Sequence, residues 1–129
     1  MIETSPRLGG DYITSTLTPL STGVNLEDEL LRISLGDKIN PQFHVLQYSG
    51  VLFFSFKVGN VVKHLPDSNF IKKMPNVVDF SFNLKEGDTV NNITSSLNRY
   101  GHLTLIANDK ASMESLFRKY EKNVEDFVF

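Results

Sequence analysis

The pattern of apolar residues changes between Gly36 and Pro41. Before this point, apolar residues recur at the three- and four-residue spacing of amphipathic helices. After it, aromatic and β-branched residues alternate with polar ones, as they do in strands. Helices followed by antiparallel strands and one covering helix indicate the α+β class. We expect two parts, residues 1–40 and residues 41–129, which form one compact domain or two small subdomains with a shared interface.

Two helices are expected in the first part. Asp11 is the candidate N-cap of the first helix, which ends at Gly23 and has an apolar face formed by Ile13, Leu17 and Leu20. The second helix spans Asn25–Leu35, with Asn25 as its N-cap and acidic residues in its first turn. Gly36 follows as a typical end signal.

The second part is expected to be built mainly of strands. The alternation predicts strands at Phe43–Tyr48, Val51–Val58, Val61–Leu65, Val78–Leu84 and His102–Ile106. Gly59-Asn60 matches the two-residue turn of a hairpin between Val51–Val58 and Val61–Leu65. Asp109 is expected to cap a final helix, and Phe127–Phe129 to add a last strand.

Composition excludes several classes of protein. The net charge of −2 and the absence of a large basic cluster argue against a nucleic-acid partner. No apolar run approaches the roughly 20 residues that a membrane span requires, and no signal peptide is recognisable. The absence of cysteine removes disulfides, thiolate metal sites and cysteine nucleophiles. We therefore expect a cytoplasmic protein that binds neither nucleic acid nor membrane.

The first residues carry the clearest functional signal. Glu3 and Arg7 flank a turn at Ser5-Pro6, and the glycines at 9 and 10 allow the backbone to approach a ligand closely. A carboxylate can bind Mg²⁺, and a guanidinium can bind phosphate or carboxylate. From spacing alone, two interpretations stay open: a half-site for a metal and an anion, or the more common surface ion pair beside a loop.

Three linked motifs in the first 36 residues resemble the closing part of an ATP-grasp catalytic domain. They are Ile2–Ile13, then Thr18–Leu26 with its Thr-Gly-Val-Asn-Leu run, then Leu31–Gly36. The Arg-Leu-Gly-Gly-Asp form is most similar to carboxylate–amine ligases of the L-amino acid ligase type, and residues 43–129 resemble the small C-terminal domain of those ligases. Biotin carboxylase is the nearest rival. The resemblance assigns residues 1–40 to the end of the catalytic domain and residues 41–129 to the small domain.

The resemblance also implies roles for individual residues. Glu3 would be a Mg²⁺ ligand that bridges ATP phosphates, and Arg7 would be the catalytic and substrate-binding residue, holding the acyl-phosphate or the substrate carboxylate. Gly9 and Gly10 would shape the same substrate pocket. Ser5 stands where the family usually has a metal-binding asparagine, so its hydroxyl either binds the metal or shapes the loop.

Enzymes of this family use ATP and Mg²⁺ to form an acyl-phosphate from a carboxylate, which an amine then attacks. Much of that apparatus is absent from this sequence, including nucleotide-covering lysines and an acidic partner for Glu3. We therefore expect a C-terminal fragment that is inactive alone, whose partners are the missing N-terminal domains, a small carboxylate and an amine. Its small domain would cover the active site or support a homodimer. One alternative is a fragment of an enzyme similar to biotin carboxylase or carbamoyl-phosphate synthase. The other is a free-standing, non-catalytic binding module.

The three histidines, His44, His64 and His102, lie far apart in the sequence, on or beside expected strands. Imidazoles at strand edges or partly exposed positions are the more common explanation of such a pattern than a metal site.

Overall fold

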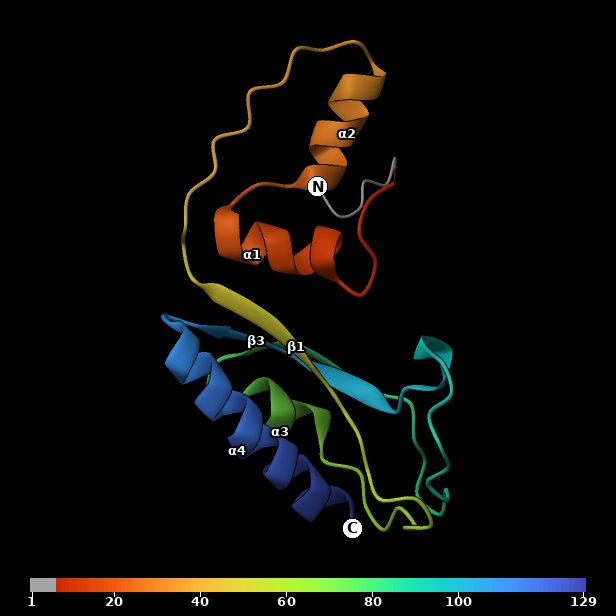
Figure 1. Ribbon diagram of the computed structural model, residues 1–129. Coiled ribbons are helices and arrows are strands. Elements are labelled where there is room, and N and C mark those ends of the chain that lie inside the picture. The colour runs from red at the N-terminus through yellow and green to blue at the C-terminus, as the bar shows by residue number, and fades with distance from the viewer. Residues whose placement is uncertain (1–6) are drawn as a thin grey trace. The chain divides into compact units, whose positions relative to one another are not determined.

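The computed structural model describes residues 7–129, which form two compact units (Figure 1). Unit 1 is Met1–Ser49, described from Arg7 onward, and unit 2 is Gly50–Phe129. The mixture of helices with a three-stranded sheet confirms the α+β class. No helix within residues 7–129 has the length and apolar character needed to cross a membrane.

Unit 1 begins with a helical rod that consists of two consecutive segments. A π-helical segment, Ile13–Leu17, continues directly into α1, Thr18–Thr22. The backbone N–H of Leu17 donates to Tyr12, five residues back, at 2.8 Å. Near Pro19 the hydrogen bonds change from the five-residue spacing of a π-helix to the four-residue spacing of an α-helix. Because proline has no N–H, one backbone donor is absent at this change in any case. The predicted helix is confirmed, but Asp11 is not its N-cap, because the helix starts from Tyr12 and Asp11 has a left-handed backbone.

The second helix of unit 1 agrees with its sequence signals. α2 spans Leu26–Ser34, and the Asn25 side chain accepts hydrogen bonds from the backbone N–H groups of Glu27 and Asp28 at 3.0 and 3.2 Å. These bonds satisfy two donors that would otherwise have no partner at the helix start. The predicted N-cap is therefore confirmed.

The strand expected at Phe43–Tyr48 is wrong, apart from Tyr48, where β1 begins. Residues 43–47 have no regular secondary structure, and their backbone hydrogen-bonds to the end of α1 instead of a neighbouring strand. The backbone N–H groups of His44 and Leu46 donate to Thr22 and Ser21 at 3.2 and 2.9 Å. The last carbonyl groups of a helix have no hydrogen-bond partner within that helix. They therefore accept the N–H groups that a neighbouring strand would otherwise bind.

A sheet in the order β1-β3-β2 lies in unit 2, apart from the first two residues of β1, which belong to unit 1. Its strands are β1 (Tyr48–Phe53), β2 (Val77–Phe82) and β3 (Gly101–Ala107). β2 and β3 are antiparallel, with Phe80 opposite Leu103, and one irregularity in register lies between Val77 and Asp79. The two predicted strands at Val78–Leu84 and His102–Ile106 are confirmed, and β3 is the central strand.

The expected hairpin around Gly59-Asn60 is wrong as a pair of strands. The turn exists, since Asn60 N–H donates to Lys57 at 3.2 Å, but the chain beyond it pairs with residues 88–90. Val62 N–H donates to Asp88 at 2.9 Å, and Val61 forms an isolated bridge with Thr89. β1 ends at Phe53, and its partner in the sheet is β3.

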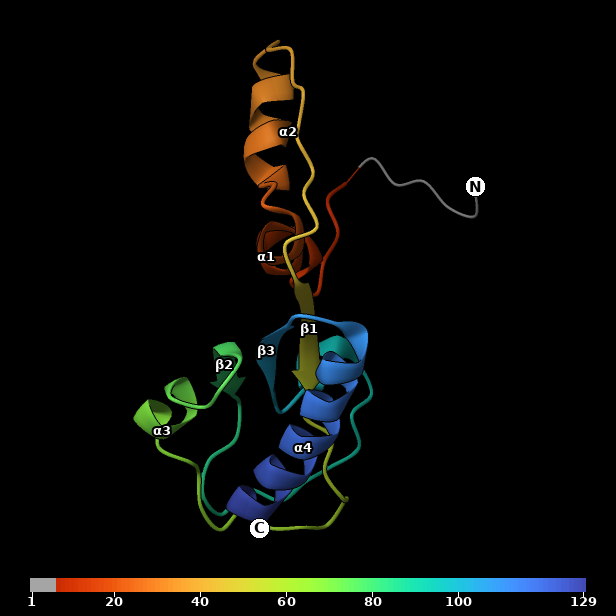
Figure 2. The same ribbon diagram turned by 90° about the vertical axis from the view of Figure 1, so that its left-hand side faces the viewer.

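Two helices pack on the same side of this sheet: α3 (Ser68–Lys72) and α4 (Lys110–Val128) (Figures 1 and 2). Asp109 caps α4, because its carboxylate accepts from Ser112 N–H at 2.8 Å. The predicted final helix is confirmed. The strand expected at Phe127–Phe129 is wrong, because Tyr120, Val124 and Val128 continue the four-residue spacing of the buried helix face.

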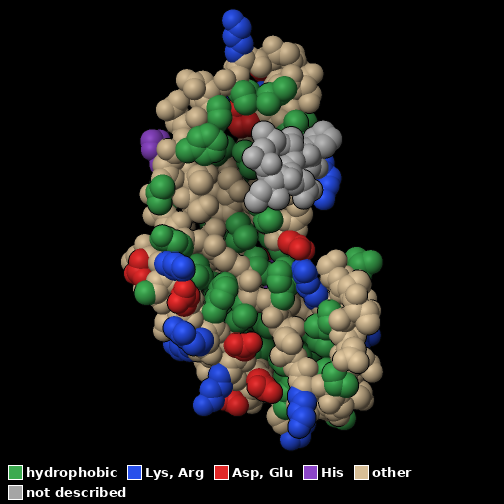
Figure 3. All heavy atoms as spheres, in the orientation of Figure 1, with side chains coloured by type: hydrophobic (Ala, Val, Ile, Leu, Met, Phe, Trp, Pro, Cys, Tyr) green, Lys and Arg blue, Asp and Glu red, His purple; other side chains and the backbone are tan. Residues whose placement is uncertain are grey.

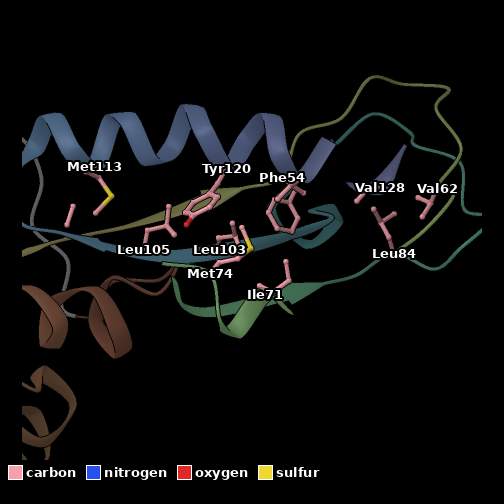
Figure 4. Close-up of a cluster of buried hydrophobic side chains, with 12 residues drawn as sticks. Phe54, Val62, Ile71, Met74, Leu84, Leu103, Leu105, Met113, Tyr120 and Val128 are labelled. Carbon is pink, nitrogen blue, oxygen red and sulfur yellow. The ribbon is translucent and has the colours of Figure 1, made fainter. Parts of the chain in front are cut away.

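The core of unit 2 lies between β3 and these helices (Figure 4). Its central side chains are fully buried, and they include Ile71 of α3, Leu103 and Leu105 of β3, and Tyr120 of α4. Aromatic rings extend the core, with the Phe54 and Phe82 ring centroids 4.7 Å apart. Burial of this apolar surface is the main source of stability for the unit.

Gly101 allows the strands to meet at the start of β3. It lies opposite Phe82, has φ of +137°, and accepts a hydrogen bond from Phe54 N–H at 3.0 Å. A Cβ atom at this position would overlap the carbonyl oxygen of Ser81 and touch the Phe54 ring.

We expect Gly101→Ala to lower the free energy of unfolding by about 3 kcal/mol or more, because backbone strain and a clash with main-chain atoms act together. Urea unfolding followed by circular dichroism would measure the loss. Gly87→Ala is the matched control, since Gly87 has φ of +89° but open space around the added Cβ. It should cost only about 1–2 kcal/mol. Equal losses in the two variants would contradict the role given to close packing at Gly101.

Candidate functional site

The N-terminal turn is where the sequence places a ligand site, and the structure describes part of it. Glu3 and Ser5, the expected metal ligands, lie outside the described residues. Arg7 is exposed, and its guanidinium donates to the carbonyl oxygen of the neighbouring Leu8 at 3.2 Å. It forms no ion pair with any residue in 7–129. The guanidinium is thus available to an anion from outside this part of the chain.

Gly9 and Gly10 follow Arg7 in an exposed turn that is tied to the π-helical segment. The Thr14 hydroxyl donates to the carbonyl oxygen of Gly9 at 2.9 Å, and Ile13 N–H donates to that of Gly10 at 3.0 Å. A side chain at Gly9 would press on Ile13 and Thr14, whereas one at Gly10 would meet nothing within 4 Å. The structure therefore gives Gly9 a packing role, while the space beside Gly10 is open.

Two features of this turn were not predicted from the sequence. Asp11 and Tyr12 both have left-handed backbones, with φ of 52° and 67°, and a π-helical segment starts directly after them. Left-handed backbone is unusual for tyrosine, and both strained residues and π-helical turns gather at functional sites. Thr14 is buried, and its hydroxyl is satisfied by Gly9. Only the Gly9-Gly10-Asp11 run could have indicated this turn.

The three histidines do not come together with acidic residues as metal ligands. His44 is exposed in unit 1, and exposed His64 in unit 2 lies 3.8 Å from the Glu86 carboxylate. Within residues 7–129, no group of three histidine, aspartate or glutamate side chains is placed to hold a metal ion.

His102 is the histidine with a defined polar environment. It lies on β3 with 4% of its surface exposed, and its Nδ1 is 2.9 Å from the Ser81 hydroxyl on β2. Its Nε2 is 3.7 Å from the Asp79 carboxylate. Burial lowers the pKa of His102, because the charged imidazolium loses water, and Asp79 partly opposes that effect. Ser81, His102 and Asp79 thus lie beside one another on two strands, with a side-chain hydrogen bond between Ser81 and His102, in a setting that favours the neutral imidazole.

The lowered pKa predicts a pH-dependent stability. The unfolded chain binds a proton at His102 near pH 6.5, whereas the folded chain binds it only at lower pH. The free energy of unfolding should therefore fall as the pH decreases from about 6.5 toward the folded pKa, and stay level above that window. Urea titrations between about pH 5 and 8 would measure this slope, and His102→Asn should reduce it.

Thr104→Val is a control from the same buried strand. The Thr104 hydroxyl is buried and has no hydrogen-bond partner within residues 7–129. Its removal should leave stability unchanged or raise it by up to about 1 kcal/mol, while the pH slope is retained. An unchanged slope in His102→Asn would show that another group titrates in this window.

Comparison with known proteins finds a matching family and a solved structure with a similar fold. Residues 52–125 match the family described as L-amino acid ligase C-terminal domain 2. The fold is similar to the crystal structure of L-amino acid ligase from Bacillus licheniformis, with a TM-score of 0.71 and 13% sequence identity. The likeness covers 90% of this chain and 29% of that chain, so this chain corresponds to less than a third of the solved protein. No protein with a curated description matches the sequence.

The match covers most of unit 2, from the last two residues of β1 to residue 125 in α4. It confirms the resemblance to the C-terminal part of ATP-grasp enzymes of the L-amino acid ligase type, and it favours that type over biotin carboxylase. The chain belongs to the L-amino acid ligase C-terminal domain 2 family.

Proposed function

We propose that this chain is the C-terminal part of an ATP-dependent ligase, which forms an acyl-phosphate from a carboxylate and ATP and joins it to an amine. The observation that carries the proposal is the family match over residues 52–125. The Glu-Thr-Ser-Pro-Arg-Leu-Gly-Gly motif before that region supports it, because it resembles the end of the catalytic domain. The chain would be inactive without the N-terminal domains of the same enzyme.

Arg7 is the described residue best suited to a role in that reaction. Its exposed guanidinium has no carboxylate partner in residues 7–129, and its planar fork matches a carboxylate or a phosphate. Fixed positive charge beside a developing acyl-phosphate stabilises the transition state without reorganisation. The open space next to Gly10 would leave room for the substrate. We assign Arg7 the binding of the substrate carboxylate or acyl-phosphate.

ATP, when bound, supplies the phosphoryl group, and Mg²⁺ neutralises its phosphate oxygens. Glu3 would hold the metal, with Ser5 as a neutral ligand or a loop-shaping residue. A cytoplasmic location is consistent with the absence of cysteine.

Unit 1 has an apolar surface that suits a neighbouring domain. α2 is strongly amphipathic, yet none of its residues is buried, and Leu30 and Ile33 of its apolar face are 43% and 51% exposed. Figure 3 shows hydrophobic side chains reaching the surface of unit 1. Single exposed apolar residues are common, but a whole helix face without cover is typical of an interface. We propose that the rest of the catalytic domain covers this face.

The first experiment is to read the gene upstream of Met1. The proposal expects an in-frame extension that encodes a nucleotide-binding domain with an acidic metal ligand. The protein encoded by the longer frame should release phosphate from ATP in the presence of Mg²⁺ and mixed amino acids, and the 129-residue chain should not. A stop codon close upstream, or an extended protein without ligase activity, would overturn the proposal in favour of a non-catalytic module.

Arg7→Ala in the longer protein should lower kcat by about 100-fold or more, as expected when one donor to the transition state is lost. Arg7→Lys should restore only part of the activity, because lysine keeps the charge but loses the fork. Arg32→Ala, which removes an exposed arginine of α2, is the control and should retain activity. Full activity in Arg7→Ala would remove Arg7 from the site.

The apolar face of α2 can be tested on the 129-residue chain itself. An environment-sensitive dye such as bis-ANS should bind it, and the double variant Leu30→Ser/Ile33→Ser should weaken the fluorescence several-fold while circular dichroism stays unchanged. Val58→Ser/Val61→Ser removes two exposed apolar side chains of unit 2 and serves as the control. Equal loss in both double variants would show that the dye does not report on α2.

A further inference from the structure

An apolar pocket with two lysines lies between α3 and α4 in unit 2. Its cavity volume is about 260 Å³, and α4 contributes Lys119, Tyr120, Asn123 and Phe127 to its lining. The residues at and after α3 contribute Phe70, Lys73 and Met74. The pocket belongs entirely to unit 2, and none of its residues has a role in the proposed ligase site.

The floor of the pocket is held in place by a hydrogen bond. Tyr120 is almost completely buried, and its hydroxyl donates to the carbonyl oxygen of Pro75 at 2.6 Å. This bond links the middle of α4 to the segment that follows α3. The Tyr120 hydroxyl is therefore already satisfied, and the buried ring is fixed beneath the pocket before any ligand arrives.

One wall is aromatic and partly open to solvent. The Phe70 and Phe127 rings meet edge to face, with centroids 5.4 Å apart. Phe70 is 50% exposed, although it belongs to a helix whose Ile71 is fully buried. If the aromatic ring of a ligand packed against Phe70 and Phe127, apolar surface of both the ligand and the protein would be buried. Contacts between aromatic rings add to the free energy gained by that burial.

The rim is positively charged. Lys119 Nζ lies 5.4 Å from the centroid of the Tyr120 ring, so the ammonium group stands over the floor. Lys73 lines the same pocket, and none of the described lining residues is acidic. Neither lysine forms an ion pair within residues 7–129. Two cations on the rim of one apolar pocket are complementary to an anion.

We propose that this pocket binds a small aromatic carboxylate, with its ring against Phe70 and Phe127 and its carboxylate beside Lys73 and Lys119. The cavity volume of about 260 Å³ lies just below the usual range for ligand pockets, so the pocket suits one ring with a short acidic chain better than a larger ligand. The inference stands on the geometry of unit 2 and does not depend on the ligase reaction.

The test uses 3-phenylpropionate with the full 129-residue chain, followed by amide chemical shifts in ¹H–¹⁵N NMR spectra. Shifts should cluster at residues 70–75 and 119–127. The uncharged analogue 3-phenylpropionamide should bind at least about five-fold more weakly, because it loses the ion pairs. Shifts spread over other surfaces, or equal affinity of the two compounds, would overturn the proposal.

Variants separate charge from shape. Lys73→Gln and Lys119→Gln should each weaken binding about two- to five-fold, while Lys122→Gln, on α4 outside the lining, should leave it unchanged. Asn123→Phe should fill the pocket and abolish binding, provided that the spectrum of the variant stays dispersed. If Asn123→Phe does not fold, the two lysine variants decide the question. Unchanged affinity in both lysine variants would contradict the proposed site.

Discussion

The burial of β3 is the constraint on which unit 2 depends. This strand lies between β1 and β2, and its apolar side chains Leu103 and Leu105 pack beneath α4. Its other face carries His102 and Thr104, which are buried as well. At the start of β3 the neighbouring chain approaches closely, since a Cβ at residue 101 would overlap the Ser81 carbonyl oxygen. Gly101 makes that approach feasible, and it precedes His102, whose environment lies between β3 and β2.

Sequence patterns predicted the elements whose signals are local. The caps Asn25 and Asp109 and the helix faces behind them are confirmed, because a side chain two or three residues from its backbone partner needs no tertiary context. β2 and β3 are also confirmed, since their alternation matches a strand with defined partners. These elements share one property: their hydrogen bonds or their spacing can be assigned within a short window of sequence.

The errors concern the choice of partner. Phe43–Tyr48 has strand composition, but its N–H groups reach the end of α1. The turn at Gly59 forms, but the next residues pair with a segment almost 30 positions further along, and no local pattern indicates that choice. In the candidate site, the sequence identified the glycine turn next to Arg7. The left-handed backbone of Tyr12 depends on how the next helix packs, and the pocket beside Tyr120 depends on how α3 and α4 meet. Neither can be read from a local sequence pattern.

The hydroxyl-rich helix of unit 1 is less hydrophilic than its sequence suggests. Thr18 and Thr22 donate to carbonyl oxygens of the same helical rod, and Ser21 donates to Leu17. Ser49 reaches the Leu17 carbonyl as well. A hydroxyl that is hydrogen-bonded inside its own helix loses little when water is removed from around it. A neighbouring surface can therefore displace water from this helix at low desolvation cost. Helix faces rich in leucine usually have this property, whereas here serine and threonine provide it.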